Sequence, residues 1–406
     1  MILSVDRRGD SKANFMPLRK LQDLDVAKKV VLTRVDFNVP FDEEGNIKET
    51  HRLKAAWPTI DYLLEREAKV VLLAHLSGKI GFKKNAPLSL ETIAKKASEV
   101  FGREIKFCPR LTGEEAKKHI AETGFGEILM LENLRTEAGE EKGDRELAEN
   151  LAELGDVYIN DGFGVCHRSH ASVVILPELL PSAAGLLIQK EVAWLEKVLA
   201  KTADLVVVLG GAKISTKMKF INKFLEEAKE VIIGGALANN LLKLKGLTVG
   251  SSLVEANLKA EDVKNIELTS SKLHLPVDVA VGNNLETENR QLKAVGKIEA
   301  DEIILDIGDE TAKLFSDIIA KAQGVVWNGP MGFFENEKFF TGTKKIAEAI
   351  AANQNFSVVG GGETVLCLDR LGLLDRFSHV STGGGAMMDF LSGDDLPGLR
   401  SLGYYD

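Results

Sequence analysis

The sequence contains little cysteine and no apolar segment of membrane length. Its 406 residues include three cysteines, Cys108, Cys166 and Cys367, and no two of them form a Cys-x-x-Cys pair. This usage argues against a disulfide framework or a structural zinc site and favours a reducing cytoplasm. No stretch reaches the ~20 apolar residues that span a bilayer, and residues 1–15 lack the apolar run of a signal peptide. We therefore predict a cytoplasmic protein without a membrane partner, in which residues 1–15 form a flexible extension and the start is either Met1 or Met16.

The sequence also lacks an excess of positive charge and the common nucleotide-binding signatures. Its 51 lysines and arginines are outnumbered by 60 aspartates and glutamates, which gives a net charge of −9. Such a chain has no general attraction to nucleic acid, so any phosphate site must be a local cluster. A Gly-x-x-x-x-Gly-Lys-Ser/Thr loop, a Gly-x-Gly-x-x-Gly turn and the protein-kinase motifs are absent. A phosphate site in this chain is therefore of another type.

Short β-branched runs alternate with segments of helical period along the chain. Because the runs are continuously apolar, they predict strands that are buried on both faces of a sheet. Regular alternation of strands with helices is typical of a parallel α/β sheet. The predicted strands are Val30–Thr33, Val70–Leu73, Ile128–Leu131, Val157–Ile159, Leu205–Leu209, Val231–Ile233, Val277–Val281, Ile303–Leu305, Val325–Trp327 and Phe356–Val359. The predicted helices include Lys54–Arg66, Glu114–Thr123, Thr216–Glu230 and Thr343–Asn353.

The residues that directly follow these runs differ between the two halves of the chain. Ligands of open parallel sheets bind beyond the carboxyl ends of the strands, so these residues form the candidate site. In the first half they are charged or polar, namely Arg34, Asp36, Asn38, His75, Glu132, Asn133, Arg135, Asn160, Asp161, Arg168 and His170. In the second half they are mostly glycines, whose N–H groups can approach a phosphate at a helix N-terminus. They lie in Gly210–Lys213, Gly234–Gly235, Asn328–Pro330, Gly360–Gly362 and Gly383–Gly385. The contrast predicts a small polar substrate facing a larger phosphate-bearing ligand.

Several of these residues have a structural reading beside the functional one. Lys213 and Lys217 are predicted to project from one face of a helix start, where a bound polyanion would offset their repulsion; a solvated basic face is the alternative. Arginines bind carboxylate and phosphate bidentately, but they also form surface ion pairs. His75 and His170 hold a substrate anion or serve as hydrogen-bonded structural residues. Glu363 is a candidate ligand of Mg²⁺ on nucleotide phosphates, or an ordinary acidic neighbour of a helix cap.

Six segments in this order resemble the phosphoglycerate kinase family, and the likeness runs from about Met16 to Leu402. In the first half they are Arg34–Pro40 (RVDFNVP), Leu131–Arg135 (LENLR) and Asn160–His170 (NDGFGVCHRSH). In the second half they are Gly210–Lys213 (GGAK), Trp327–Gly332 (WNGPMG) and Ser381–Ala386 (STGGGA). The resemblance implies reversible transfer of the acyl phosphate of 1,3-bisphosphoglycerate to MgADP, giving 3-phosphoglycerate and MgATP.

The resemblance also implies roles for individual residues. Transfer would be direct and in line, with catalysis from positioning and charge neutralisation. By similarity, Arg52, Lys217, Gly362 and Gly385 serve catalysis, and Glu363 holds the Mg²⁺. The implied substrate-binding residues are Asp36, Asn38, Arg52, His75, Arg135 and Arg168. The implied nucleotide-binding residues are Gly211, Lys213, Lys217, Gly234, Gly235, Asn328, Glu335, Gly361, Gly362, Glu363 and Thr364, with Glu335 on the ribose.

A domain boundary is expected where an apolar loop, Pro177–Pro181, runs into a helical pattern over Leu187–Ala200. We therefore expect an α/β fold of two Rossmann-like domains, each a parallel sheet flanked by helices, joined by a hinge helix. The expected ranges are 16–186 for a triose-phosphate-binding domain, 187–200 for the hinge helix, 201–392 for a nucleotide-binding domain, and 393–406 for a tail that packs back on the first domain. The family implies that the domains close around both ligands, and we expect a monomer.

Four positions depart from the family pattern. Where the family reads His-Leu-Gly-Arg, this chain reads HLSGK at His75–Lys79, so a substrate-binding arginine is missing and Lys79, Lys83 or Lys84 is expected to replace it. The other departures are Thr216 and Glu363, each in place of an aspartate, and Gly308-Asp309 in place of Gly-Pro. Two alternatives therefore stay open: a kinase that acts on a different acyl phosphate, and a non-catalytic nucleotide-binding scaffold.

Overall fold

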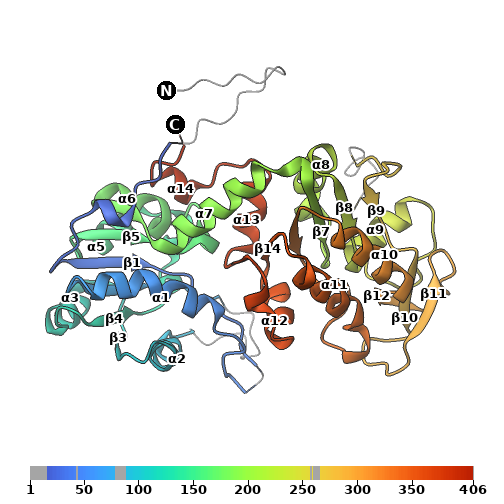
Figure 1. Cartoon of the computed structure of the whole chain (residues 1–406). Coiled ribbons are helices and arrows are strands. Elements are labelled where there is room, and N and C mark those ends of the chain that lie inside the picture. Colours follow the sequence, from blue (N-terminus) through green and yellow to red (C-terminus); the bar gives the residue numbers. More distant parts are fainter. Residues whose placement is uncertain (1–15, 43, 78–87, 257, 259–265, 406) are drawn as a thin grey trace. The chain divides into compact units, whose positions relative to one another are not determined.

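Two parts of the chain each form a central parallel sheet, as Figure 1 shows for the computed structural model. The structure describes residues 16–405 except 43, 78–87, 257 and 259–265. The chain divides into a first unit of residues 1–191 and 395–406 and a second unit of residues 192–394. The division falls inside helix α7, Leu186–Leu199.

In the first unit, six parallel strands have the order β3-β4-β2-β1-β5-β6. Alternate side chains of β2 enter two different cores: Val70 and Leu72 pack with residues of α1 and α2, while Val71 and Leu73 pack with residues of α3 and α5. The predicted burial on both faces is therefore confirmed. The strands are β1 Val30–Arg34, β2 Lys69–Leu73, β3 Ile105–Cys108, β4 Ile128–Leu131, β5 Val157–Asn160 and β6 Ser182–Ala184. The helices are α1 His51–Leu64, α2 Glu91–Phe101, α3 Gly113–Glu122, α4 Ala138–Lys142, α5 Arg145–Ala152, α6 Leu176–Leu179 and α14 Pro397–Arg400, with short turns η1 Leu21–Asp23, η2 Leu134–Thr136, η3 Phe163–Val165 and η4 Ala171–Ile175.

In the second unit, another six parallel strands have the order β15-β14-β13-β7-β8-β9. One face of this sheet packs on α10 and α11 through a core that contains Trp327, Phe315 and Ile346. The strands are β7 Leu205–Leu209, β8 Glu230–Ile233, β9 Leu273–His274, β13 Gly324–Asn328, β14 Phe356–Gly360 and β15 His379–Ser381. The helices are α8 Met218–Glu227, α9 Gly235–Leu244, α10 Asp309–Ala320, α11 Thr341–Ala352, α12 Gly362–Arg370 and α13 Gly384–Leu391, with short turns η5 Thr202–Asp204, η6 Ser215–Lys217, η7 Glu337–Phe339 and η8 Leu374–Arg376.

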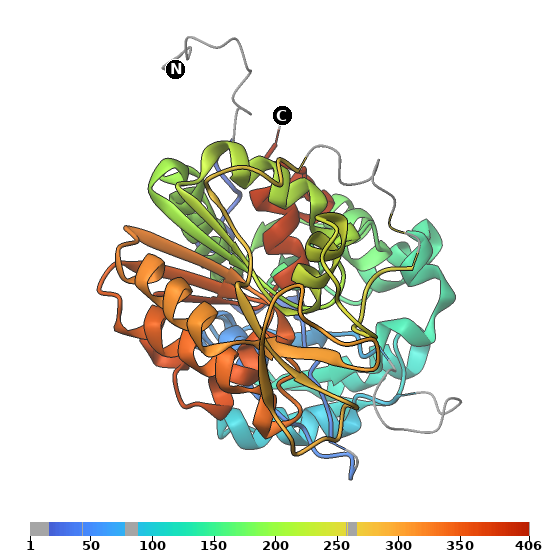
Figure 2. The ribbon, with the colours of Figure 1, turned by 90° about the vertical axis from the view of Figure 1, so that its right-hand side faces the viewer.

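The second unit also contains a three-stranded antiparallel sheet, which Figure 2 shows in gold to orange apart from the parallel strands. It has the order β11-β10-β12, formed by Asp278–Gly282 (β10), Gln291–Ala294 (β11) and Ile303–Ile307 (β12). The prediction that Val277–Val281 and Ile303–Leu305 belong to a parallel sheet is therefore wrong. The loops between these strands contain no helix, and a short non-helical loop reverses the chain, whereas a parallel pair needs a longer crossover.

The α/β fold class is confirmed by the two parallel sheets with helices around them. The strands that the apolar runs did not predict are short or weakly apolar: β3, β6, β9, β11 and β15. Among the described residues, no helix has the length and apolar character to cross a bilayer.

Candidate functional site

Five strands of the second unit end in one row. Ile233, Leu209, Asn328, Gly360 and Ser381 are successive register partners across β8, β7, β13, β14 and β15. Because parallel strands end at the same edge of a sheet, the turns that follow them meet there. The structure thereby brings together several predicted residues at one edge of the sheet, which we call the glycine edge. They are Gly211, Gly234, Gly235, Asn328, Gly361, Gly362 and Gly385.

Two helix N-termini lie against each other at this edge. Helix α12 begins at Gly362 and α13 at Gly384, and neither has a side-chain cap. A Cβ atom on Gly384 would lie 2.5 Å from the Cα of Gly361, so no other residue fits there. Gly361 itself has φ +102°, which is a glycine conformation. The first N–H groups of both helices therefore remain available to an anion.

Lys217 lies at the same edge and is held by neutral oxygens. Its Nζ donates hydrogen bonds to the carbonyl oxygen of Gly210 at 2.6 Å and to Oδ1 of Asn328 at 2.8 Å. Removal from water lowers the pKa of Lys217 to about 8, a change that the charge of Glu363 partly opposes. A bound polyanion would stabilise the charged ammonium that its neutral partners stabilise only weakly.

Lys213 differs from Lys217 in its surroundings. Its side chain is exposed, in the turn that precedes η6, whereas Lys217 ends η6 and α8 begins only at Met218. The prediction that both lysines project from one face of a helix start is therefore wrong. A three-residue 3₁₀ turn, with three residues per turn, intervenes instead of an α-helical turn.

Asn328 and Thr364 join the strand ends to one another. Asn328 Nδ2 donates to the carbonyl oxygen of Gly360 at 2.9 Å, while its Oδ1 accepts from Lys217. The N–H of Gly329 donates to Oγ1 of Thr364 at 2.8 Å. Both predicted side chains thus hold the glycine turns in place.

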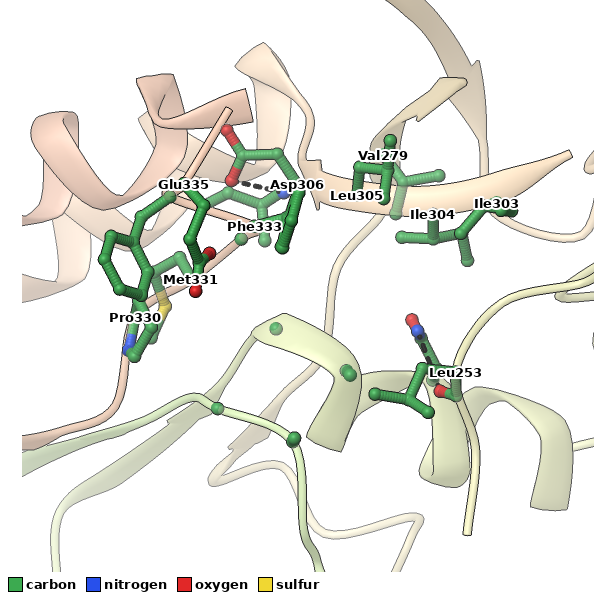
Figure 3. A pocket seen from close by; sticks show the side chains of 18 of the residues that line it. Leu253, Val279, Ile303, Ile304, Leu305, Asp306, Pro330, Met331, Phe333 and Glu335 are labelled. Atoms are coloured by element: carbon green, nitrogen blue, oxygen red, sulfur yellow. Dashed lines mark hydrogen bonds between the residues drawn. The ribbon is translucent and has the colours of Figure 1, made fainter. Parts of the chain in front are cut away.

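An apolar pocket of the second unit borders this edge (Figure 3). Gly211 and Gly235 form part of its wall, and Glu335 and Glu363 also line it. The antiparallel sheet supplies further apolar wall, so this sheet has a place in the site that the sequence did not indicate. The apolar side chains that Figure 3 labels are Leu253, Val279, Ile303, Ile304, Leu305, Pro330, Met331 and Phe333. Gly234 is not among the residues that line the pocket, and a Cβ there would lie 2.7 Å from Sδ of Met331.

A buried carboxyl group, Asp306, also lines the pocket (Figure 3). Its oxygens accept hydrogen bonds from the N–H groups of Ile307 at 2.9 Å and Gly342 at 2.7 Å. Burial raises the pKa of Asp306 to about 7. Asp306 is not one of the predicted site residues, although it directly follows the predicted strand Ile303–Leu305.

Glu363 is suited to a magnesium ion that carries few protein ligands. It is an exposed residue in the first turn of α12, and it lines the pocket beside the glycine edge. Among the described residues, no cluster of three or more potential ligand side chains could hold a metal ion. One carboxylate beside a phosphate-binding edge fits Mg²⁺, which is commonly bound by nucleotide phosphates, water and one or two carboxylates.

In the first unit, Asp36, Asn38 and Arg52 form a connected group after β1. Arg52 Nη1 lies 3.3 Å from Oδ1 of Asp36 and donates to the carbonyl oxygen of Asn38 at 2.6 Å. Asn38 Oδ1 accepts from both the N–H and the hydroxyl of Ser77, at 3.1 and 3.2 Å. Three predicted residues are therefore brought together, and Ser77 is an additional partner.

His75 is a buried residue of the same unit that contacts one arginine and is affected by the charges of three more. His75 is 2% exposed, and its Nδ1 lies 3.1 Å from Nη2 of Arg34. Burial, followed by the charges of Arg34, Arg135, Arg168 and Arg52, holds the pKa of His75 well below its usual range. A buried ring on which four arginine charges act is a functional-site candidate, and the positive charge favours an anionic ligand.

We call His75 and the four arginines whose charges act on it, Arg34, Arg52, Arg135 and Arg168, the basic cluster. Arg135 pairs with Glu141 at 3.0 Å, and its buried Nε has no hydrogen-bond partner among the described residues. Burial lowers the pKa of Arg135. Arg168 Nε donates to Nε2 of His167 at 3.3 Å.

His170, the other candidate histidine, lies beside a buried carboxylate of the first unit. Its Nδ1 is 3.6 Å from Oε1 of the fully buried Glu140. Glu140 also accepts hydrogen bonds from the N–H and hydroxyl of Ser172, at 2.9 and 2.6 Å. Glu140 and Ser172 were not predicted as site residues, because neither directly follows a predicted strand. Lys79, Lys83 and Lys84, the expected substitutes for the missing arginine, lie outside the described residues.

One α/β unit thus carries a basic cluster, and the other carries a glycine edge with a lysine and an apolar pocket. These features favour the class of kinases that act on small metabolites. The phosphoglycerate kinase family model matches residues 21–394, and the chain belongs to this family.

Curated relatives and solved structures agree with the family match. The chain is 42% identical over 388 residues to a phosphoglycerate kinase of Pseudothermotoga lettingae, covering 94% of this chain and 98% of the relative. It is also 42% identical over 399 residues to that of Aquifex aeolicus, covering 95% and 98%. A solved phosphoglycerate kinase of Pyrococcus horikoshii has a TM-score of 0.85 at 32% identity, and that of Coxiella burnetii 0.78 at 33%; each comparison covers 95% of this chain and 99% of the other. The chain is therefore an enzyme of the kinase class, and neither the scaffold nor the different acyl phosphate is favoured.

Proposed function

We propose that the chain transfers the acyl phosphate of 1,3-bisphosphoglycerate to MgADP, in the reversible reaction that also yields MgATP and 3-phosphoglycerate. The second unit binds the nucleotide, with its base and ribose in the apolar pocket and Glu335 on the ribose. The first unit binds the triose phosphate through the basic cluster and the Asp36–Asn38–Arg52 group. Family membership and the different chemistry of the two sites support this assignment.

The observation that carries the proposal is the position of Lys217 in the glycine edge. Its ammonium group is held by the carbonyl of Gly210 and by Asn328, with the N-termini of α12 and α13 following neighbouring strands of the same row. Cations and fixed amide dipoles of this kind stabilise the charge that builds up on a phosphoryl group in transfer. Lys217, Gly362 and Gly385 act there as catalytic groups, with Arg52 as the charge-neutralising group of the first unit.

Magnesium supplies charge neutralisation on the nucleotide phosphates when it is bound. Glu363 would hold the ion, and Gly211, Lys213 and Gly361 would bind the nucleotide phosphates. Lys79, Lys83 or Lys84 takes the place of the missing substrate-binding arginine. The two units close around both ligands with α7 as the hinge, because direct transfer requires the acyl phosphate and ADP to meet.

A coupled assay tests the reaction. The chain should turn over with 3-phosphoglycerate, ATP and Mg²⁺, and in the reverse direction with 1,3-bisphosphoglycerate and ADP. Turnover with acetyl phosphate and ADP, and none with 3-phosphoglycerate, would instead assign a different acyl phosphate. Binding of ADP without turnover of either would assign a scaffold.

We further propose that the enzyme acts as a cytoplasmic monomer without a nucleic-acid or membrane partner. The three cysteines are free and buried, as suits a reducing compartment. Sedimentation equilibrium with and without both substrates tests the monomer. A dimer at assay concentrations would contradict it.

A further inference from the structure

A fully buried arginine, Arg34, contacts the candidate substrate-binding residue His75. Arg34 lies at the end of β1 with none of its surface exposed. All three guanidinium nitrogens are engaged: Nε donates to Oγ of Ser172 at 3.0 Å, Nη1 donates to the carbonyl oxygen of Val35, and Nη2 lies 3.1 Å from Nδ1 of His75. Its orientation is therefore determined by three separate partners.

Behind Arg34, a buried carboxylate completes the chain of contacts. Ser172 donates its N–H and its hydroxyl to Glu140, and its carbonyl oxygen accepts from the hydroxyl of Tyr158 at 2.6 Å. Both Glu140 and Tyr158 are fully buried. Although burial opposes it, the nearby imidazole of His170, the charge of Arg34 and the hydrogen bonds from Ser172 hold the pKa of Glu140 below its usual range. The buried guanidinium charge of Arg34 is thus balanced by the ionised carboxylate of Glu140, and the hydroxyl of Ser172 links the two groups.

The contact between Arg34 and His75 has only one consistent proton arrangement. A guanidinium group donates hydrogen bonds and accepts none. The Nδ1 atom of His75 must therefore be the unprotonated acceptor, which leaves the single proton of the neutral ring on Nε2. We propose that Arg34 is a positioning residue that fixes His75 as the neutral tautomer with Nε2–H, so that His75 offers the substrate a neutral donor instead of a positive charge.

The surroundings of His75 support the same arrangement. The charged groups that act on the ring are Arg34 from β1, Arg52 from α1, Arg135 from η2 and Arg168 from the turn after η3. All four are cations, and a second proton on the ring would add a fifth positive charge. In the part of the chain that the structure describes, no hydrogen bond occupies Nε2 of His75, so this atom remains available for a ligand.

The inference rests on the proposed function only for the identity of the ligand at Nε2. The proton arrangement itself is measurable in the ligand-free protein. With ¹⁵N-labelled histidine, His75 should show an unprotonated Nδ1 and a protonated Nε2, and these resonances should not titrate between about pH 5 and pH 8. A protonated Nδ1, or a His75 that titrates near its ordinary pKa, would overturn the proposal.

Two variants test the role of Arg34. In Arg34→Met, Nδ1 loses its fixed donor, so we expect mixed tautomers, a rise in the pKa of His75, and a KM for 3-phosphoglycerate that increases about tenfold and becomes pH-dependent, with kcat changed much less. Arg34→Lys retains a cation without the planar fork and should show an intermediate tautomer ratio. Unchanged His75 resonances in both variants would refute the positioning role.

Arg145→Met is a matched control, because Arg145 is an exposed arginine of the same unit that pairs with Glu149. It should leave both the His75 spectrum and KM unaltered. If Arg34→Met does not fold, Ser172→Ala removes the partner of Nε and leaves the charge in place, and partial loss of the tautomer preference is the expected result. A correct tautomer in a protein that does not turn over 3-phosphoglycerate would refute the proposed function alone.

Discussion

The Nζ atom of Lys217 lies 2.8 Å from Oδ1 of Asn328, and the amide nitrogen of the same Asn328 side chain donates to the carbonyl oxygen of Gly360. One asparagine therefore links the proposed catalytic lysine to the strand that leads into α12. In the described part of the chain, no carboxylate forms a hydrogen bond with Lys217. The residue before this lysine is Thr216, at the position where the family pattern has an aspartate. The threonine hydroxyl donates instead to the carbonyl oxygen of Lys213.

Replacement of Lys217 should remove a transition-state charge and leave the fold intact. For Lys217→Ala we expect kcat to fall ~10²-fold or more, because groups of this kind stabilise charge that develops only during transfer. Steady-state kinetics measures the effect, and circular dichroism checks the fold. Lys219→Ala is the control, since Lys219 is an exposed lysine on the following helix that pairs with Asp394. An unchanged kcat in Lys217→Ala would remove Lys217 from the mechanism.

ADP binding should be accompanied by proton uptake in mildly alkaline solution. The pKa of Lys217 is lowered to about 8 in the ligand-free protein by burial, and a neighbouring polyphosphate would raise it. At about pH 8.5 the free lysine is largely neutral and the bound one charged, so binding takes up protons; at about pH 6.5 it is charged in both states and uptake is absent. Calorimetry in buffers of different ionisation enthalpy measures the number of protons. Equal uptake by wild type and Lys217→Met would show that another group titrates.

The fold and part of the site could be predicted from the sequence, because strand order along the chain and the residues after each strand are local information. The apolar run Leu205–Leu209 and the glycines that follow it are one such case. The link between Arg34 and Ser172 could not be predicted, since 138 residues separate them and only the finished fold brings them together. Asp306 was missed for a related reason: its partner Gly342 is supplied by a distant helix start. The antiparallel direction of β10 and β12 depends on their loops and not on the apolar pattern that was used to find them.

Asp161 should make the first unit less stable as the pH rises. Its Oδ1 accepts hydrogen bonds from the hydroxyl of Thr59 at 2.8 Å and the N–H of Leu187 at 3.0 Å, and burial raises its pKa from 3.8 to about 7. Because the folded state binds this proton more tightly than the unfolded state does, protonated Asp161 stabilises the fold at low pH. This stabilisation is lost as the pH rises through the folded-state pKa of about 7. Asp161→Asn removes the titration.

The unfolding free energy of Asp161→Asn minus that of the wild type should therefore increase by about 2–3 kcal/mol as the pH is raised from about 5 to about 8. Denaturant titrations at several pH values measure the difference. Asp156→Asn, at an exposed position on the same unit, should give a curve parallel to wild type. Parallel curves for both variants would show that Asp161 does not carry the pH dependence.

Two neighbouring glycines should respond differently to an added methyl group. A Cβ atom on Gly362 meets nothing within 4 Å, whereas one on Gly384 would lie 2.5 Å from the Cα of Gly361. Gly384→Ala must therefore push α12 and α13 apart, and we expect it to lower both kcat and thermal stability. Gly362→Ala should cost little stability, since its side chain projects into open space at the first residue of α12.

The same open space is where we place the phosphoryl group during transfer, so Gly362→Ala should still lower kcat, by about tenfold or more. Its signature is loss of turnover with an unchanged melting temperature, while Gly384→Ala loses both. The two variants thus separate a group that borders the reacting phosphate from one that only supports the helix starts. Full activity in Gly362→Ala would place the phosphoryl group elsewhere along the glycine edge, because a methyl group and a transferring phosphate cannot share that volume.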